Sequence, residues 1–122
     1  MDPGVPQVDA LEADRRLRDG APDSPLLVDV REVGEFVAVR AAGAALLPMS
    51  TILPRLDELP RDRELLLICR SGARSNQVAH YLAANGWTNV ANVSGGLLAW
   101  ERAGLPVHHG PPAPGEGALP GR

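Results

Sequence analysis

The chain has 122 residues, with 12 basic and 15 acidic side chains mixed along its length and a formal net charge of −3. This length suits one domain with one hydrophobic core. No basic run provides a nucleic-acid footprint, and no apolar run approaches the roughly 18 residues of a membrane span. We therefore expect a soluble domain that binds neither nucleic acid nor membrane.

The first residues lack the basic segment followed by an apolar stretch that is typical of a secretory signal. The chain contains one cysteine, Cys69, which cannot form an internal disulfide. A lone thiol suits a reducing compartment. These features predict a cytoplasmic location.

The N-terminal third of the chain alternates between strand and helix patterns. A short edge strand is expected near residues 5–8, followed by a helix with Asp9 as its N-cap and Glu12 at the capping-box position. Residues 26–30 are an apolar run typical of a buried strand. A short helix is expected over residues 32–39, with Phe36 turned inward.

The same alternation continues to residue 103. Strands are expected at residues 44–47, 64–68 and 89–93, and helices at residues 51–59, 75–84 and 97–103, with Ser50 capping the first of these helices. Alternating strands and helices favour a parallel sheet covered on both faces. The sequence therefore predicts a three-layer α/β/α fold with a mostly parallel five-stranded central sheet.

The C-terminal residues differ in composition. Residues 108–122 are dominated by proline and glycine and have little apolar surface to offset the entropy of ordering. We expect residues 1–107 to form the domain and residues 108–122 to form a disordered tail.

The segment most informative about function runs from residue 65 to residue 75. Four apolar residues lead into Cys69, and a polar turn with Gly72 leads into the next helix. At such a junction the unpaired N–H groups and the positive end of the helix dipole favour a thiolate, which is the reactive form of cysteine. Arg70 and Arg74 add positive charge. The alternative is a small buried core residue, the common role of a free cysteine.

Three segments together resemble a single-domain rhodanese. They are Leu26-Leu27-Val28-Asp29-Val30-Arg31-Glu32, Cys69-Arg70-Ser71-Gly72-Ala73-Arg74-Ser75, and the stretch from Val93-Ser94-Gly95-Gly96 through Trp100 to Val107. They occur in the family's order, and the resemblance covers residues 8–107. It implies a rhodanese-like fold.

The resemblance also implies an activity. Cys69 would take a sulfane sulfur from a donor such as thiosulfate or a persulfide, hold it as a persulfide, and pass it to a thiol, cyanide or a sulfur-carrier protein. No metal or organic cofactor is implied. Asp29 and Arg31 would support the architecture, and the anion-holding loop would consist of Arg70, Ser71, Gly72, Ala73, Arg74 and Ser75.

Two other functions compete with sulfur transfer. Related cysteine phosphatases carry five residues between cysteine and arginine, whereas four separate Cys69 from Arg74 here, and a phosphate needs more room than one sulfur atom. The short loop therefore disfavours phosphate-ester hydrolysis or arsenate reduction. The non-enzyme alternative is a rhodanese-like module that binds or regulates a partner, which the presence of Cys69 disfavours.

Two departures from the family pattern bear on the donor. The segment from Val39 to Ala44 keeps only the final Gly-Ala of the usual motif, and it adds Arg40, which we expect to place a positive charge near the site. Glu35 stands near the position where two-domain rhodaneses carry a basic thiosulfate-binding residue. An acid there predicts that thiosulfate is a poor donor. Arg74 is expected either to pair with an acid or to contact the substrate.

Overall fold

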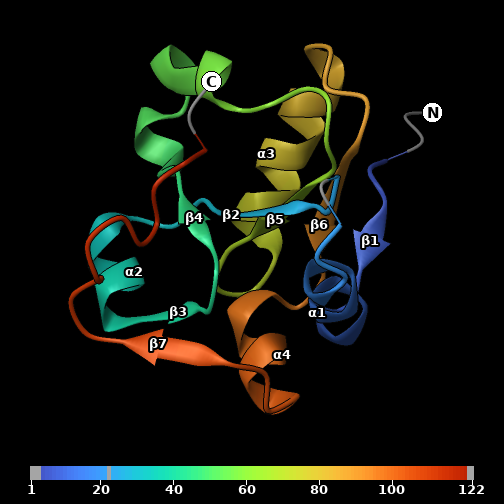
Figure 1. The fold of residues 1–122 in the computed structure, drawn as a ribbon. Helices are drawn as coiled ribbons and strands as arrows, with labels where there is room; N and C mark the ends of the chain where they lie inside the picture. The colour runs from blue at the N-terminus through green and yellow to red at the C-terminus, as the bar shows by residue number, and fades with distance from the viewer. Residues whose placement is uncertain (1–3, 22, 121–122) are drawn as a thin grey trace.

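The structure, a computed structural model, describes residues 4–21 and 23–120. Its centre is a parallel five-stranded sheet with the strand order β1-β6-β5-β2-β4 (Figure 1). A second, two-stranded sheet pairs β3 (Val39–Ala41) antiparallel with β7 (Val107–His109). The five strands of the central sheet are β1 (Gln7–Val8), β2 (Leu26–Asp29), β4 (Ala45–Leu46), β5 (Leu65–Ile68) and β6 (Val90–Val93).

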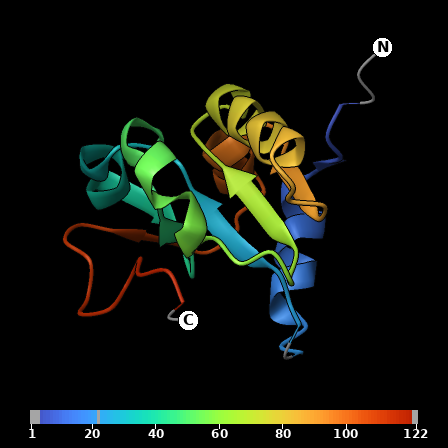
Figure 2. The same cartoon turned by 90° about the horizontal axis from the view of Figure 1, so that it is seen from above.

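Helices cover both faces of this sheet (Figure 2). One buried cluster joins Val78 and Leu82 of α3 to the side chains of the 3₁₀ segments, and the other joins Ala13 of α1, Phe36 of α2 and Trp100 of α4. The predicted α/β/α arrangement is therefore confirmed. The helices are α1 (Ala10–Arg18), α2 (Val33–Ala38), α3 (Ala73–Ala84) and α4 (Gly96–Arg102), with 3₁₀ helices η1 (Met49–Thr51) and η2 (Leu53–Glu58).

The central strands β2 and β5 are fully buried because both of their faces are covered. They run parallel in a register that places Asp29 beside Ile68. The carboxyl ends of parallel strands meet at one edge of the sheet. The residues that follow β2 therefore lie next to the loop that follows β5, and this edge holds the candidate site.

Two predicted helix starts have different outcomes. The carboxylate of Asp9 accepts a hydrogen bond from the Glu12 N–H at 2.8 Å, so the predicted N-cap is confirmed. The predicted helix over residues 51–59 is instead two 3₁₀ helices. The Ser50 hydroxyl donates to the Glu32 carboxylate at 2.6 Å and so does not cap a helix.

The C-terminal segment, residues 108–120, differs from the disordered tail expected for residues 108–122, of which residues 121 and 122 lie outside the described part of the chain. It completes β7 and then runs past α2 and β4 (Figure 1). Arg40 holds it in place by donating to the Glu116 carboxylate at 2.6 and 3.0 Å and to the Gly110 carbonyl at 2.7 Å. The Leu46 N–H, at the outer edge of β4, donates to the Gly117 carbonyl at 2.8 Å. Polar contacts to distant residues, rather than apolar burial alone, order this segment.

Across residues 4–21 and 23–120, none of the helices has the length and apolar character that a membrane span requires.

Candidate active site

Cys69 lies at the junction between the central strand and a helix. It directly follows β5, and α3 begins four residues later at Ala73. Gly72 makes this tight junction possible, because its φ of 102° belongs to the left-handed region that side chains disfavour. The helix begins two residues earlier than predicted, so its N-terminal N–H groups lie closer to the sulfur.

The Sγ of Cys69 is surrounded by hydrogen-bond donors. The Gly72 N–H donates to Sγ at 3.1 Å, and the Ser75 hydroxyl lies 3.3 Å from it. Burial raises the pKa of Cys69, but hydrogen bonds from the Ser75 hydroxyl and from the N–H groups of Ser75, Gly72 and Ser71 outweigh it. The pKa therefore lies below its ordinary value. The loop favours a thiolate.

The sulfur is deep in the loop whereas several loop side chains face solvent. Cys69 is 1% exposed and contacts the hydrophobic cluster beneath α3. Arg70, Ser71 and Ala73 are exposed, and Arg74 is half-buried. The cysteine is thus buried, as the core-residue alternative requires, yet it also accepts hydrogen bonds that a purely apolar core position would not supply.

The start of α4 holds the backbone of this loop. The Leu97 N–H donates to the Cys69 carbonyl at 2.8 Å, and the Leu98 N–H donates to the Arg70 carbonyl at 3.1 Å. Gly96 permits this approach, since a Cβ at that position would lie 2.5 Å from the Cys69 carbonyl oxygen. The Gly95-Gly96 turn therefore allows the start of α4 to fix the carbonyl groups of Cys69 and Arg70.

Asp29 and Arg31 form a buried pair beside the loop. Arg31 donates through Nε and Nη2 to the Asp29 carboxylate at 2.8–3.1 Å, and through Nη2 to the Val39 carbonyl at 2.6 Å. Both residues are at most 3% exposed. These contacts connect the end of β2 to β3, which is what a supporting role requires.

Arg74 pairs with an acid, one of the two alternatives left open by the sequence. Its guanidinium donates to both oxygens of Glu35 at 2.8 and 2.9 Å. Hydrogen bonds from Arg74 lower the pKa of Glu35 to about 2. The expectation that Glu35 repels an anionic donor therefore needs correction, because the Arg74 guanidinium compensates its negative charge.

Arg40 also needs correction. We expected it to place a positive charge near the site, but its side chain is 2% exposed and its guanidinium binds Glu116. A buried and paired guanidinium cannot attract an anion from solvent. Arg70, in contrast to Arg40, is exposed.

Asn92 belongs to the site but was missed by the sequence analysis. It lies on β6, is 3% exposed, and its Oδ1 accepts a hydrogen bond from the Ser75 hydroxyl at 2.6 Å. The signal was present in the sequence, since an asparagine interrupts an apolar run that is otherwise typical of a buried strand. A buried amide requires hydrogen-bond partners.

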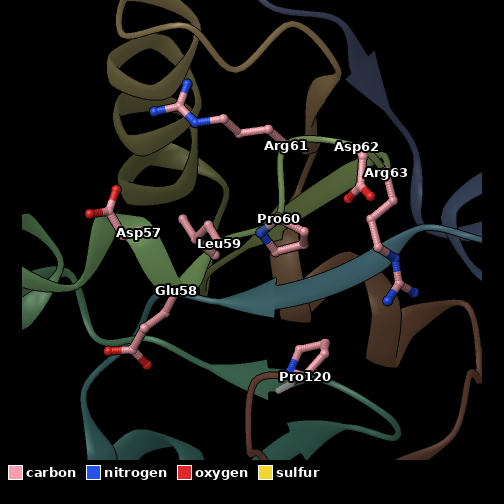
Figure 3. A pocket seen from close by; sticks show the side chains of 8 residues that line it. All are labelled: Asp57, Glu58, Leu59, Pro60, Arg61, Asp62, Arg63 and Pro120. Carbon is pink, nitrogen blue, oxygen red and sulfur yellow. The ribbon is translucent and has the colours of Figure 1, made fainter. Parts of the chain in front are cut away.

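A cavity of about 520 Å³ lies away from this site (Figure 3). It is formed by the turn that precedes β5, so it lies at the amino end of that strand whereas Cys69 lies at the carboxyl end. The guanidinium of Arg61, one of its lining residues, already stacks 3.6 Å from the centre of the Trp87 ring. The lining residues are Asp57, Glu58, Leu59, Pro60, Arg61, Asp62, Arg63 and Pro120.

The fold and the site together define a class of α/β domain that holds a cysteine among hydrogen-bond donors in the loop at the carboxyl end of its central strand. The family model for the rhodanese-like domain matches residues 9–103. The chain therefore belongs to the rhodanese-like domain family, as its three sequence motifs predicted.

Several relatives carry names that agree with this family. A sulfurtransferase of Allochromatium vinosum is 41% identical over 103 residues, covering 84% of this chain and 94% of that protein. The putative sulfurtransferase YtwF of Bacillus subtilis is 38% identical, covering 75% of this chain and 80% of that protein. The thiosulfate sulfurtransferase GlpE of Actinobacillus succinogenes is 35% identical, covering 70% and 77% respectively.

Solved structures agree with the fold. A rhodanese-like domain protein of Staphylococcus aureus is 33% identical with a TM-score of 0.71, covering 78% of this chain and 90% of that one. A rhodanese-related protein of Thermoplasma volcanium has a TM-score of 0.76 at 26% identity, covering 84% and 97%.

Proposed function

We propose that this protein transfers sulfane sulfur from a donor to a thiophilic acceptor through a persulfide on Cys69. One observation carries the proposal: the Cys69 Sγ accepts the Gly72 N–H and lies within hydrogen-bonding distance of the Ser75 hydroxyl at the start of α3. These donors stabilise a negative charge on sulfur at neutral pH. The names of the relatives support the same class of reaction.

The first half-reaction loads the cysteine. With thiosulfate as donor, the Cys69 thiolate attacks the outer sulfur, a new S–S bond forms, and the bond between the two sulfur atoms of thiosulfate breaks. Sulfite leaves with that electron pair, and the negative charge of the thiolate passes to the terminal sulfur of the persulfide. The N–H groups of the loop and the dipole of α3 favour this anion.

The second half-reaction unloads it. An acceptor such as cyanide attacks the terminal sulfur, the persulfide S–S bond breaks, and Cys69 leaves as the thiolate while thiocyanate departs. Splitting the transfer into two steps gives ping-pong kinetics. The same hydrogen bonds that lower the pKa of Cys69 also make its thiolate a better leaving group in this step.

Donor choice is the finer part of the proposal. The compensated charge of Glu35 removes the reason to expect thiosulfate to be excluded, and GlpE is a thiosulfate sulfurtransferase. We propose that thiosulfate and small persulfides both serve as donors, and that a thiol, cyanide or a sulfur-carrier protein serves as acceptor. The competing function, a module that only binds a partner, gains no support from a cysteine with a lowered pKa.

The decisive experiment is mass spectrometry of the intact protein after incubation with thiosulfate or glutathione persulfide. We expect a mass gain of one sulfur atom on Cys69, lost again when cyanide is added with release of thiocyanate. Cys69→Ser is the control, because the serine hydroxyl is nearly isosteric but too basic to ionise near neutral pH. A folded Cys69→Ser variant that still produces thiocyanate at the parent's rate would overturn the mechanism.

A further inference from the structure

The Ser75 hydroxyl carries one proton but faces more than one acceptor. Its Oγ lies 2.6 Å from Oδ1 of Asn92 and 3.3 Å from Sγ of Cys69, with the Gly72 carbonyl also at 3.3 Å. A hydroxyl donates one hydrogen bond at a time and accepts through its lone pairs. The two functional acceptors, an amide oxygen and the reacting sulfur, therefore compete for the same proton.

The amide of Asn92 is oriented so that its oxygen, rather than its nitrogen, faces Ser75. Its Nδ2 donates to the Gln7 Oε1 at 2.8 Å and to the Gly72 carbonyl at 3.3 Å. Gln7 is itself oriented, because its Nε2 donates to the Asn76 Oδ1 at 2.9 Å and to the Val5 carbonyl at 3.3 Å. If the Asn92 amide were reversed, its oxygen would face two other oxygens, the Gln7 Oε1 and the Gly72 carbonyl. The network therefore fixes the orientation in which Oδ1 faces Ser75.

We propose that Asn92 is a positioning residue that holds the Ser75 proton away from the sulfur while Cys69 is a thiol and releases it when Cys69 becomes a thiolate. In the thiol state the Ser75 O–H donates to Asn92, and its lone pair can accept from the Cys69 S–H. On ionisation the thiol proton passes to water. The Ser75 O–H then rotates to donate to the sulfur, and no proton moves from Ser75.

The inference deepens the proposed function and rests on it, since it concerns how the nucleophile of that reaction ionises. Ser75, Cys69 and Asn92 are each at most 3% exposed, so water does not readily replace any of these partners. The neighbouring charged groups are Arg74 on α3, Glu35 on α2 and Asp29 at the end of β2. All three remain unchanged in the variants below.

This arrangement predicts that removing the competing acceptor favours the thiolate. Asn92→Leu keeps a similar volume but removes the nearest acceptor of the Ser75 proton, so only the Gly72 carbonyl at 3.3 Å still competes with the sulfur. At a pH well below the midpoint of Cys69 ionisation, we expect about fivefold more thiolate in Asn92→Leu than in the parent. This is the factor that one ordinary hydrogen bond contributes to an equilibrium. Ser75→Ala removes the donor and shifts the ionisation of Cys69 to higher pH.

The test is the pH dependence of Cys69 alkylation by iodoacetamide, together with the ultraviolet absorbance of the thiolate. Both signals report one site, because the chain has one cysteine. We expect the midpoint of Asn92→Leu to move to lower pH, and the double variant with Ser75→Ala to match Ser75→Ala alone. Asn92→Ala provides the same comparison if the leucine variant does not fold.

A merely structural role for Asn92 gives the opposite sign. Loosening the loop would weaken the N–H donors around Sγ and move the midpoint to higher pH in either Asn92 variant. That result, an unchanged midpoint, or a shift that persists in the Ser75→Ala background would overturn the proposal. Alkylation does not depend on sulfur transfer, so a protein that shows these shifts but forms no persulfide would refute the proposed function alone.

Discussion

The guanidinium of Arg74 and the carboxylate of Glu35 form a bidentate ion pair that connects the start of α3 to the first turn of α2. Both side chains remain about one third exposed, at 37% and 33%. Because α2 follows β2 and α3 follows the Cys69 loop, the pair ties the two neighbouring strand ends together across the site. It also leaves the positive charge of Arg74 compensated, which sets the electrostatics that an anionic donor meets.

Neutralising Glu35 should therefore improve the use of an anionic donor. In Glu35→Gln the Arg74 charge loses its compensating partner, and we expect the KM for thiosulfate to fall roughly two- to fivefold, the range that a partly exposed charge pair contributes. The kcat should change less, since the attraction acts on the bound donor and the transition state alike. Steady-state kinetics at low salt measure both constants.

Glu101→Gln is the matched control for this variant, because it removes an exposed acid on α4 without touching Arg74. Its KM for thiosulfate should equal that of the parent. A KM for Glu35→Gln that is unchanged or higher would show that the acid does not limit donor binding.

The same pair predicts how stability depends on pH. The folded pKa of Glu35 is about 2, below its ordinary value of 4.5. Its contribution to the free energy of unfolding is therefore fully present above about pH 4.5 and is lost as the pH falls toward 2. Urea denaturation should show a difference between the parent and Glu35→Gln at pH 6 that shrinks steadily below pH 4.5. A difference that stays constant over this range would rule out the ionised pair as its source.

Arg70 should attract the donor from solvent. It is exposed beside Cys69, and neutralising it in Arg70→Ala should raise the KM for thiosulfate by roughly two- to fivefold at low salt with a smaller effect on kcat. The effect should weaken at physiological salt, where exposed charges are screened over about 8 Å. Arg102→Ala, which removes an exposed charge at the far end of α4, should leave the KM unchanged. Equal KM values for Arg70→Ala and the parent at low salt would contradict electrostatic capture.

Gly96 should be required for stability for two reasons, its positive φ and its close approach to the Cys69 and Arg70 carbonyls. Gly96→Ala places a Cβ against the Cys69 and Arg70 carbonyls in a backbone with a φ of +57°, whereas Gly104→Ala adds one at a φ of +73° with nothing within 4 Å. We expect Gly104→Ala to cost about 1–2 kcal/mol of unfolding free energy from backbone strain alone. Gly96→Ala should cost clearly more, and alkylation of its Cys69 should become slower near neutral pH. Equal destabilisation by both variants would mean that the close approach of α4 to the loop is relaxed at little expense.

Much of this fold can be predicted from local sequence patterns. The apolar runs before Asp29 and before Cys69 predict buried neighbouring strands, and parallel strands bring their carboxyl ends together without further information. The turn at Gly72 places a helix start beside the thiol. These inferences need only the order of residues along short segments, which is why they agree with the structure.

The parts that sequence reasoning missed depend on residues far apart in the chain. The partner of Arg40 is Glu116, 76 positions later, so no local sequence pattern around either residue indicates the contact. The Asn92 amide likewise reaches Gln7, 85 positions earlier, and Ser75, 17 positions earlier. Composition predicted a disordered tail because it counts apolar surface and does not include polar contacts of this kind.

The hydrogen bond from Leu46 to Gly117 has a consequence for how the molecule behaves in a crowded solution. β4 is an outermost strand of the central sheet, and an outermost strand with uncovered N–H groups is a template for pairing with another chain. The Gly117 carbonyl occupies one such group, and the proline-rich stretch around it offers few N–H donors with which to extend the sheet. The C-terminal segment thereby covers part of this sheet edge, and we expect its proteolytic removal to expose the Leu46 N–H to pairing with another chain.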